Sequence, residues 1–102
     1  MITRMWRGWA PADRAHEYER HYRSEVLSVL QGVPGFAGAR LLRRTSGGET
    51  EFVSLTLFAD LDAVRAFAGP DYETAVVADE ARAVLTRYEE RVSHYETAFE
   101  AG

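Results

Sequence analysis

The sequence predicts an α+β fold in which the elements follow the order strand, helix, strand, strand, helices, strand. Several stretches alternate apolar and polar residues with a period near two, which favours strands. The stretches between them repeat apolar residues at helical spacing and end at glycine or proline turns. This order is the split βαβ arrangement, so we expect a ferredoxin-like βαββαβ fold with an antiparallel sheet in a single domain, residues 1–102.

The first part of the chain predicts a strand over 2–9 and a long helix over 11–32. Pro11 and Asp13 suit the first turn of that helix, and Gly32 suits its end. The residues expected on its inward face share helical spacing: Ala15, Tyr18, Tyr22, Val26, Val29 and Leu30.

The stretch VPGF at 33–36 turns the chain into a second strand, expected over 36–45. The sequence SGGE at 46–49 predicts a hairpin turn, because glycine tolerates positive φ. A third strand, expected over 50–58, follows this turn.

The last part of the chain predicts two helices and a final strand. Asp60 is a candidate cap for the first helix, which Gly69 and the following proline end. A second helix is expected over 78–90, and the alternation over 91–99 predicts the last strand.

The third strand carries apolar side chains on both faces. One face holds Phe52, Ser54, Thr56 and Phe58, and the other holds Val53, Leu55 and Leu57. A few short helices can cover only one side of a sheet, so we expect a second copy of the chain to cover the other side in a twofold homodimer. Roughly 700 Å² of apolar area would contribute about 15–20 kcal/mol before entropy costs. The alternative is a monomer with an unusually apolar surface.

The composition excludes several classes of protein. The net charge is −4 and no basic stripe occurs, so nucleic acid is not an expected partner. The chain has no cysteine, which excludes disulfides and thiolate metal sites. No signal peptide and no apolar run long enough for a membrane span are found, so a cytoplasmic protein is expected.

The order of elements, VPGF before the second strand, and FVSLTLFADLDAVRAF over 52–67 resemble the antibiotic biosynthesis monooxygenase type of dimeric α+β barrel. The resemblance covers nearly the whole chain. It implies two sheets packed face to face, with a small apolar cavity between the helices and the sheet of each subunit. Some members of that family oxygenate aromatic polyketide intermediates with O₂ alone, and others degrade haem.

The family's catalytic positions fall on different residue types here. The asparagine, tryptophan and tyrosine of the cofactor-free oxygenases fall on Ser54, Phe58 and Val64. The segment that carries the proximal histidine of the haem degraders has no histidine here, and their tryptophan falls on Phe67. As a whole, the resemblance to this family implies a monooxygenase-like enzyme without a cofactor, acting on an apolar aromatic or polyketide-type substrate.

The candidate catalytic residues are His94, Ser54 and Tyr72. His94 shares a strand face with Glu96, and a histidine in the cavity could act as a general base; its alternative place is a strand edge or the dimer seam. Ser54 can donate and accept a hydrogen bond. Tyr72 lies on a bridge that could form a lid, or it could simply anchor that loop.

The candidate substrate-binding residues are aromatic: Trp6, Tyr18, Tyr22, Phe58 and Phe67. Core packing is the alternative for the tyrosines. Arg4 shares a face with Trp6 and could meet an acidic group of a ligand. His16 and His21 are expected at the surface of the first helix. They are five residues apart, about 140° from alignment on a helix, so no metal site is expected.

Two other functions stay open at this point. One is a non-catalytic dimer that binds a hydrophobic ligand, and the other is a polyketide cyclase or isomerase of the same fold, which would not consume O₂.

Overall fold

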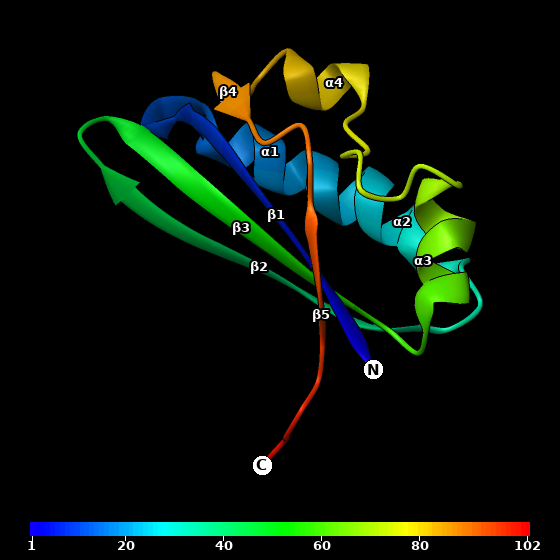
Figure 1. The fold of residues 1–102 in the computed structure, drawn as a ribbon. Coiled ribbons are helices and arrows are strands. Elements are labelled where there is room, and N and C mark those ends of the chain that lie inside the picture. Colours follow the sequence, from blue (N-terminus) through cyan, green and yellow to red (C-terminus); the bar gives the residue numbers. More distant parts are fainter.

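The computed structural model describes all residues from Met1 to Gly102 and confirms the ferredoxin-like α+β fold with an antiparallel sheet (Figure 1). The long strands lie in the order β2-β3-β1, and two short strands pair with the free edge of β1. The strands are β1 (Ile2–Pro11), β2 (Phe36–Ser46), β3 (Glu49–Phe58), β4 (Arg87–Tyr88) and β5 (Ser93–Glu96).

The predicted long helix is present as one continuous rod with a wider turn in its middle. Its segments are η1 (Ala12–Arg14), α1 (Ala15–His21), the π-helical η2 (Tyr22–Val26) and α2 (Leu27–Gln31). The amide of Leu27 donates to the carbonyl of Tyr22, five residues earlier, which is the hydrogen bond of a π-turn.

Helix α3 (Leu61–Ala68) begins and ends where the sequence predicts. The Asp60 carboxylate accepts a hydrogen bond from the Ala63 amide at 2.9 Å, and Gly69 ends the helix with a φ of 84°. The turn before β2 packs directly on this helix. A Cβ on Gly35, whose φ is 89°, would lie 2.7 Å from the Ala63 Cβ, so only glycine fits there.

The prediction of a helix over 78–90 and a strand over 91–99 is wrong in its boundaries. Helix α4 spans only Asp79–Arg82, and after a turn at residues 83–84 the chain leads into the short strand β4. The amides of Thr86 and Glu89 donate to carbonyls on the edge of β1 at 2.8 and 2.9 Å. These bonds satisfy the open edge of β1 and replace those of a longer helix.

The helices cover one face of the sheet. Trp6, Phe52, Thr56 and Phe58 are buried on that face, and the apolar ones among them form two core clusters with helical residues such as Leu30. Of the inward stripe predicted for the long helix, Val29 is the exception, since 59% of it is exposed. It lies at the rim of the cavity described below.

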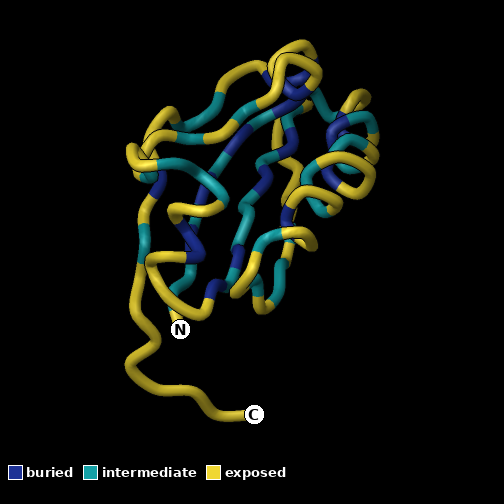
Figure 2. The backbone as a smooth tube through the Cα atoms, turned by 90° about the vertical axis from the view of Figure 1, so that its right-hand side faces the viewer, coloured by how far each residue is buried: buried dark blue, intermediate teal, exposed yellow.

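The opposite face of the sheet has no helix over it. Val53, Leu55 and Leu57 are half-buried there, and Leu42 and Tyr95 are 47% and 53% exposed. Beyond β5 the last residues form an exposed tail that leaves the body of the molecule (Figure 2). No helix is both long enough and apolar enough to cross a bilayer.

Candidate active site

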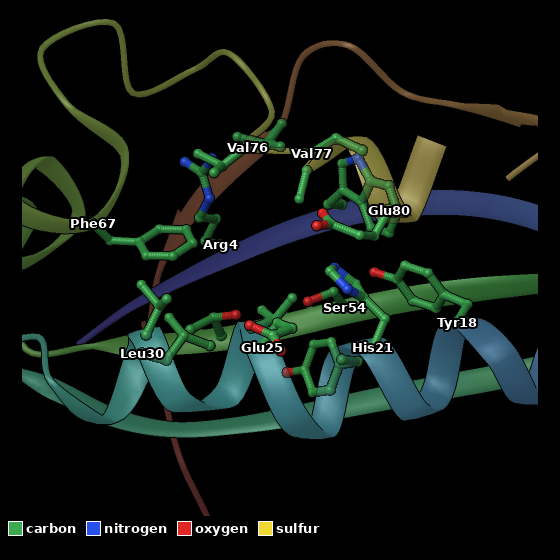
Figure 3. Close-up of a pocket in the computed structure, with 18 residues that line it drawn as sticks. Arg4, Tyr18, His21, Glu25, Leu30, Ser54, Phe67, Val76, Val77 and Glu80 are labelled. Atoms are coloured by element: carbon green, nitrogen blue, oxygen red, sulfur yellow. The ribbon is translucent and has the colours of Figure 1, made fainter. Parts of the chain in front are cut away.

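A cavity of about 270 Å³ lies between the helices and the inner face of the sheet (Figure 3). Twelve of its 18 lining residues are hydrophobic, so a ligand there would be held mainly by apolar contact. The lining residues are Arg4, Trp6, Tyr18, His21, Tyr22, Glu25, Val26, Val29, Leu30, Ser54, Thr56, Phe67, Val76, Val77, Ala78, Glu80, Ala81 and Val92.

The π-turn explains how the long helix lines this cavity. Its lining residues form two columns with a spacing of four: His21, Glu25 and Val29, and Tyr22, Val26 and Leu30. In a regular α-helix a spacing of four drifts by about 40° at each step. The wider turn offsets this drift, so both columns face the cavity.

Five of the residues predicted for the site line the cavity: Ser54, Trp6, Tyr18, Tyr22 and Phe67. They come from β1, β3, α1, the π-turn and α3, so the structure brings together residues spread over the first two thirds of the chain. Three other predicted residues do not line it: His94, Tyr72 and Phe58.

Phe58 lies behind the wall of the cavity. It is fully buried and packs against Phe67, with ring centroids 6.0 Å apart. Phe58 is not among the residues that line the cavity, so a direct contact with a substrate stays a prediction that the structure does not test. Its side chain supports Phe67, which lines the cavity.

His94 and Tyr72 lie on the far side of Arg4. Their rings meet edge to face with centroids 5.3 Å apart, and both line a separate shallow depression at the sheet edge. The Arg4 guanidinium lies 3.0 Å from His94 Nε2. An arginine can only donate, so His94 accepts through Nε2 and is neutral. Burial, and then the Arg4 charge, lower the pKa of His94, and the Glu73 carboxylate opposes them.

Arg4 is the most unusual polar residue of the site. It is 5% exposed, and its guanidinium donates to the main-chain carbonyls of Tyr72 and Thr74. Burial lowers the pKa of Arg4 to about 10. These bonds fasten the segment before Val76 and Val77, which covers the cavity.

The two tyrosines that line the cavity are both deprived of water. Burial raises the pKa of Tyr18, and it also raises the pKa of Tyr22, which the nearby Ser54 hydroxyl partly offsets. The approach of Ser54 does not have the geometry of a hydrogen bond, and the Tyr22 hydroxyl has no partner. A buried hydroxyl without a partner is a group that a ligand could satisfy.

Trp6 forms a fixed wall of the cavity. Its indole N–H donates to the Glu89 carbonyl at 3.0 Å, and its ring contacts Tyr18 and Tyr88. The absence of a side chain at Gly8 leaves room for the indole, because a Cβ there would overlap the outer ring of Trp6.

Sequence reasoning missed three ionisable residues of the cavity: His21, Glu25 and Glu80. His21 was expected at the surface, yet it is half-buried and its ring lies beside Tyr18, at 6.1 Å between centroids. Figure 3 shows His21 and Ser54 pointing into the same part of the cavity. The spacing of four from His21 to Glu25 and Val29 was the available signal. No cluster of three or more His, Cys, Asp or Glu residues could hold a metal ion.

Residues 1–79 match the family described as antibiotic biosynthesis monooxygenase. The chain belongs to this family. No curated protein sequence is significantly similar to it. The match over residues 1–79 confirms the family resemblance that the sequence predicted.

Solved structures with similar folds include members of this family. MhuD from Mycobacterium tuberculosis, a haem degrader solved with two haems in its active site, is 24% identical with a TM-score of 0.68, and all of both chains is covered. SnoaB from Streptomyces nogalater, a cofactor-independent oxygenase, is 22% identical with a TM-score of 0.69, covering 97% of this chain and 94% of SnoaB. A putative monooxygenase of the family from Bacillus cereus is 10% identical with a TM-score of 0.73, covering 100% of this chain and 95% of that one. At these identities the likeness concerns the fold.

Proposed function

We propose that this protein is a monooxygenase that needs no cofactor and oxidises an apolar, aromatic or polyketide-type small molecule in the cavity between its helices and its sheet. The observation that carries the proposal is a mainly apolar cavity in a chain of the antibiotic biosynthesis monooxygenase family, with a histidine and hydroxyl groups along its wall.

The size of the cavity suits a flat ring system. A protein cavity of about 150 Å³ holds one benzene molecule. The 270 Å³ found here therefore suits about two fused rings, and a larger ligand would extend past the rim at Val29, Glu25 and Glu80, which are exposed.

A haem fits the cavity poorly. The one histidine in the wall, His21, lies beside Tyr18 and faces Ser54. The cover segment, residues 70–81, contains no histidine. The proposed chemistry therefore uses only the side chains of this chain.

The reaction would begin with removal of a proton from an acidic C–H group of the substrate. His21 is the proposed acceptor, because it lines the cavity, and Ser54 is proposed to hold the substrate oxygen that gains negative charge. The substrate anion reduces O₂ and forms a C–O bond. Loss of the second hydrogen with cleavage of the O–O bond gives a carbonyl and water, so that CH₂ and O₂ become C=O and H₂O.

The role first expected for His94 changes in this proposal. His94 and Tyr72 act through Arg4: His94 Nε2 and the Tyr72 carbonyl both accept hydrogen bonds from its guanidinium. We therefore propose them as positioning residues for the cover of the cavity, not as groups that touch substrate.

The proposed assembly is a homodimer. The sheet face opposite the helices carries Leu42, Val53, Leu55 and Leu57, and no part of the same chain covers it. A second copy packed on this face would remove that apolar surface from water.

Oxygen uptake tests the activity. The protein, freed of metals and flavin, is supplied with a panel of anthrone-type and naphthol-type substrates, and we expect one O₂ to be consumed per carbonyl formed. His21→Gln should lower kcat about 10²-fold or more, since a general base contributes ~10²–10⁴. His16→Gln, at an exposed position on the same helix, is the matched control and should leave kcat unchanged.

Three outcomes would contradict the proposal. Absence of turnover across the panel argues against an oxygenase and, if ligands bind, for the non-catalytic binding protein. Product formation without O₂ would indicate a cyclase or isomerase. Full activity of His21→Gln would remove His21 from the mechanism.

A further inference from the structure

The positive charge of Arg4 is buried without a negative partner. The arginines that form ion pairs with carboxylates are Arg7, Arg14, Arg43, Arg44, Arg65, Arg87 and Arg91, and all of them are at the surface or half-buried. Arg4 is 5% exposed, and every group that accepts from it is neutral. Burying an uncompensated charge is strongly unfavourable, so such a residue calls for an explanation.

The guanidinium of Arg4 has unused donors. Its Nη1 donates to the Tyr72 carbonyl and to His94 Nε2, and its Nη2 donates to the Thr74 carbonyl. An arginine has five N–H groups. The N–H of Nε and the second N–H of Nη2 therefore have no protein partner. These two nitrogens share one edge of the planar group, which is an arrangement that binds a carboxylate through both oxygens.

The surroundings of Arg4 favour an anion of an aromatic ligand. Arg4 lines the cavity, and its guanidinium carbon lies 5.6 Å from the centre of the Phe67 ring. Figure 3 shows Arg4 and Phe67 together at one end of the cavity, with Glu80 and Tyr18 toward the other. A ligand anion would be attracted to the Arg4 end and repelled by Glu80, and the apolar walls would strengthen both effects.

We propose that this cavity selects ligands that carry an anionic oxygen group, a carboxylate or an ionised phenol or enol, and that Arg4 binds that group through Nε and Nη2. The inference deepens the proposed function, since it concerns the same cavity, but it makes a statement about binding that does not depend on turnover. It assigns Arg4 two roles: it fastens the cover segment through Tyr72 and Thr74, and it determines the orientation of the ligand.

Calorimetric binding to the wild-type protein tests the selectivity. The probes are 1-naphthoate, its neutral methyl ester, and 2,4-dinitro-1-naphthol, which is ionised at neutral pH. We expect at least one anion to bind ten-fold or more tightly than the ester. Preference for naphthoate alone identifies a carboxylate ligand, and preference for the naphtholate alone identifies a phenolate or enolate.

Substitution of Arg4 tests the assignment. Arg4→Met keeps the aliphatic stem and removes the charge, and it should reduce the preference for the anion over the ester to within about two-fold. Because the variant also loses the bonds to the cover segment, the measured quantity is the ratio of the two affinities. Arg4→Lys keeps a charge without the planar edge and should retain only part of the preference. The control is Arg7→Met, since Arg7 lies on the same strand but pairs with Glu89 and does not line the cavity.

The outcomes separate this inference from the proposed function. Equal affinity of the wild-type protein for naphthoate, naphtholate and ester would overturn the role of Arg4 and leave the cavity as a binding site. An unchanged preference in Arg4→Met would do the same. If Arg4→Met does not fold, the wild-type preference and the Arg4→Lys variant still decide the question. Failure of every probe to bind would overturn both the inference and the proposed function.

Discussion

The wall formed by Trp6 depends on the absence of a side chain at Gly8, and this dependence can be measured. In Gly8→Ala the new Cβ would overlap Cη2 of the indole and would lie 2.8 Å from Cζ2 and 3.1 Å from Cζ3. Cη2 and Cζ2 would both lie far inside van der Waals contact with the new Cβ, so Trp6 has to move.

The expected loss of stability follows from three effects. Forcing a buried side chain from its packed position costs about 1–3 kcal/mol. The displaced indole also weakens its hydrogen bond to the Glu89 carbonyl, worth about 1 kcal/mol. Alanine in place of glycine inside a strand returns about 0.5–1 kcal/mol. The net prediction is a decrease of about 2 kcal/mol in the free energy of unfolding.

A double-mutant cycle isolates the cause. The three atoms that the new Cβ approaches belong to the outer ring of the fused indole, and the single phenyl ring of phenylalanine does not extend as far. In a Trp6→Phe background, Gly8→Ala should therefore cost less than about 0.5 kcal/mol, so that the coupling energy is about 2 kcal/mol. Urea unfolding at one protein concentration measures all four variants. Additive effects of the two substitutions would refute the reasoning.

Three further predictions concern the site and the assembly. Tyr22→Phe removes a buried hydroxyl that has no partner, so stability should be unchanged or slightly raised, while the affinity for a hydroxylated aromatic ligand falls several-fold; a clear loss of stability would show that the hydroxyl has a partner in the protein. The lowered pKa of His94 means that the unfolded chain binds a proton more readily than the folded one. Neutral His94 therefore contributes to the free energy of unfolding in full above pH 6.5, and this contribution is lost as the pH falls below that value. Between pH 7.5 and 5.5 the free energy of unfolding of His94→Gln should therefore change less with pH than that of the wild type. An equal change in both proteins would speak against the lowered pKa of His94. Leu55→Glu places a charge on the uncovered face of the sheet and should give a folded monomer in sedimentation experiments; a wild-type protein that is itself a monomer at low concentration would contradict the proposed dimer.

Local signals predicted most of the fold. The ends of β3 and α3 follow from alternation, from the Asp60 cap and from Gly69, and each of these is decided by neighbouring residues. The segment from Asp79 to Tyr88 was not predictable in this way. Its helical pattern is real, but the open edge of β1 competes for its amides, and that edge is known only once the sheet is assembled.

The candidate site was predicted in part, for a related reason. Alternation puts Ser54 and Phe58 on one face of the third strand, and the structure shows that the helices cover this face. A face is not a cavity, however: Phe67 covers Phe58, and Ser54 is left open. The pairing of His94 with Arg4 across β1 and β5 is a finding of the structure that the sequence did not predict. Arg4 lies between His94 and the cavity. No sequence pattern shows which of two neighbouring side chains on a strand face lies nearer the cavity.

The position of His21 on the long helix was also mispredicted from the sequence, for a different physical reason. A regular helical wheel places His21 about 100° from Tyr22 and so toward the surface. The π-turn over Tyr22–Val26 adds one residue to a single turn and brings both columns of side chains to the cavity. Single π-turns of this kind occur frequently at functional sites, so a spacing of four that persists through a helix is a useful signal for such a turn.

Two polar groups of the cavity that lack partners distinguish what stabilises the fold from what binds a ligand. A buried phenol without a hydrogen bond and a buried guanidinium without a counter-charge both reduce stability. Tyr22 and Arg4 both line the one cavity that the helices and the sheet enclose. Arg7 Nε, outside the cavity, also has no hydrogen bond, but the Arg7 guanidinium is paired with Glu89 and Glu51. Two departures within one cavity, with no such compensation, indicate that ligand binding explains them. Substitutions there should therefore affect ligand affinity more than stability, whereas Gly8→Ala should affect stability first.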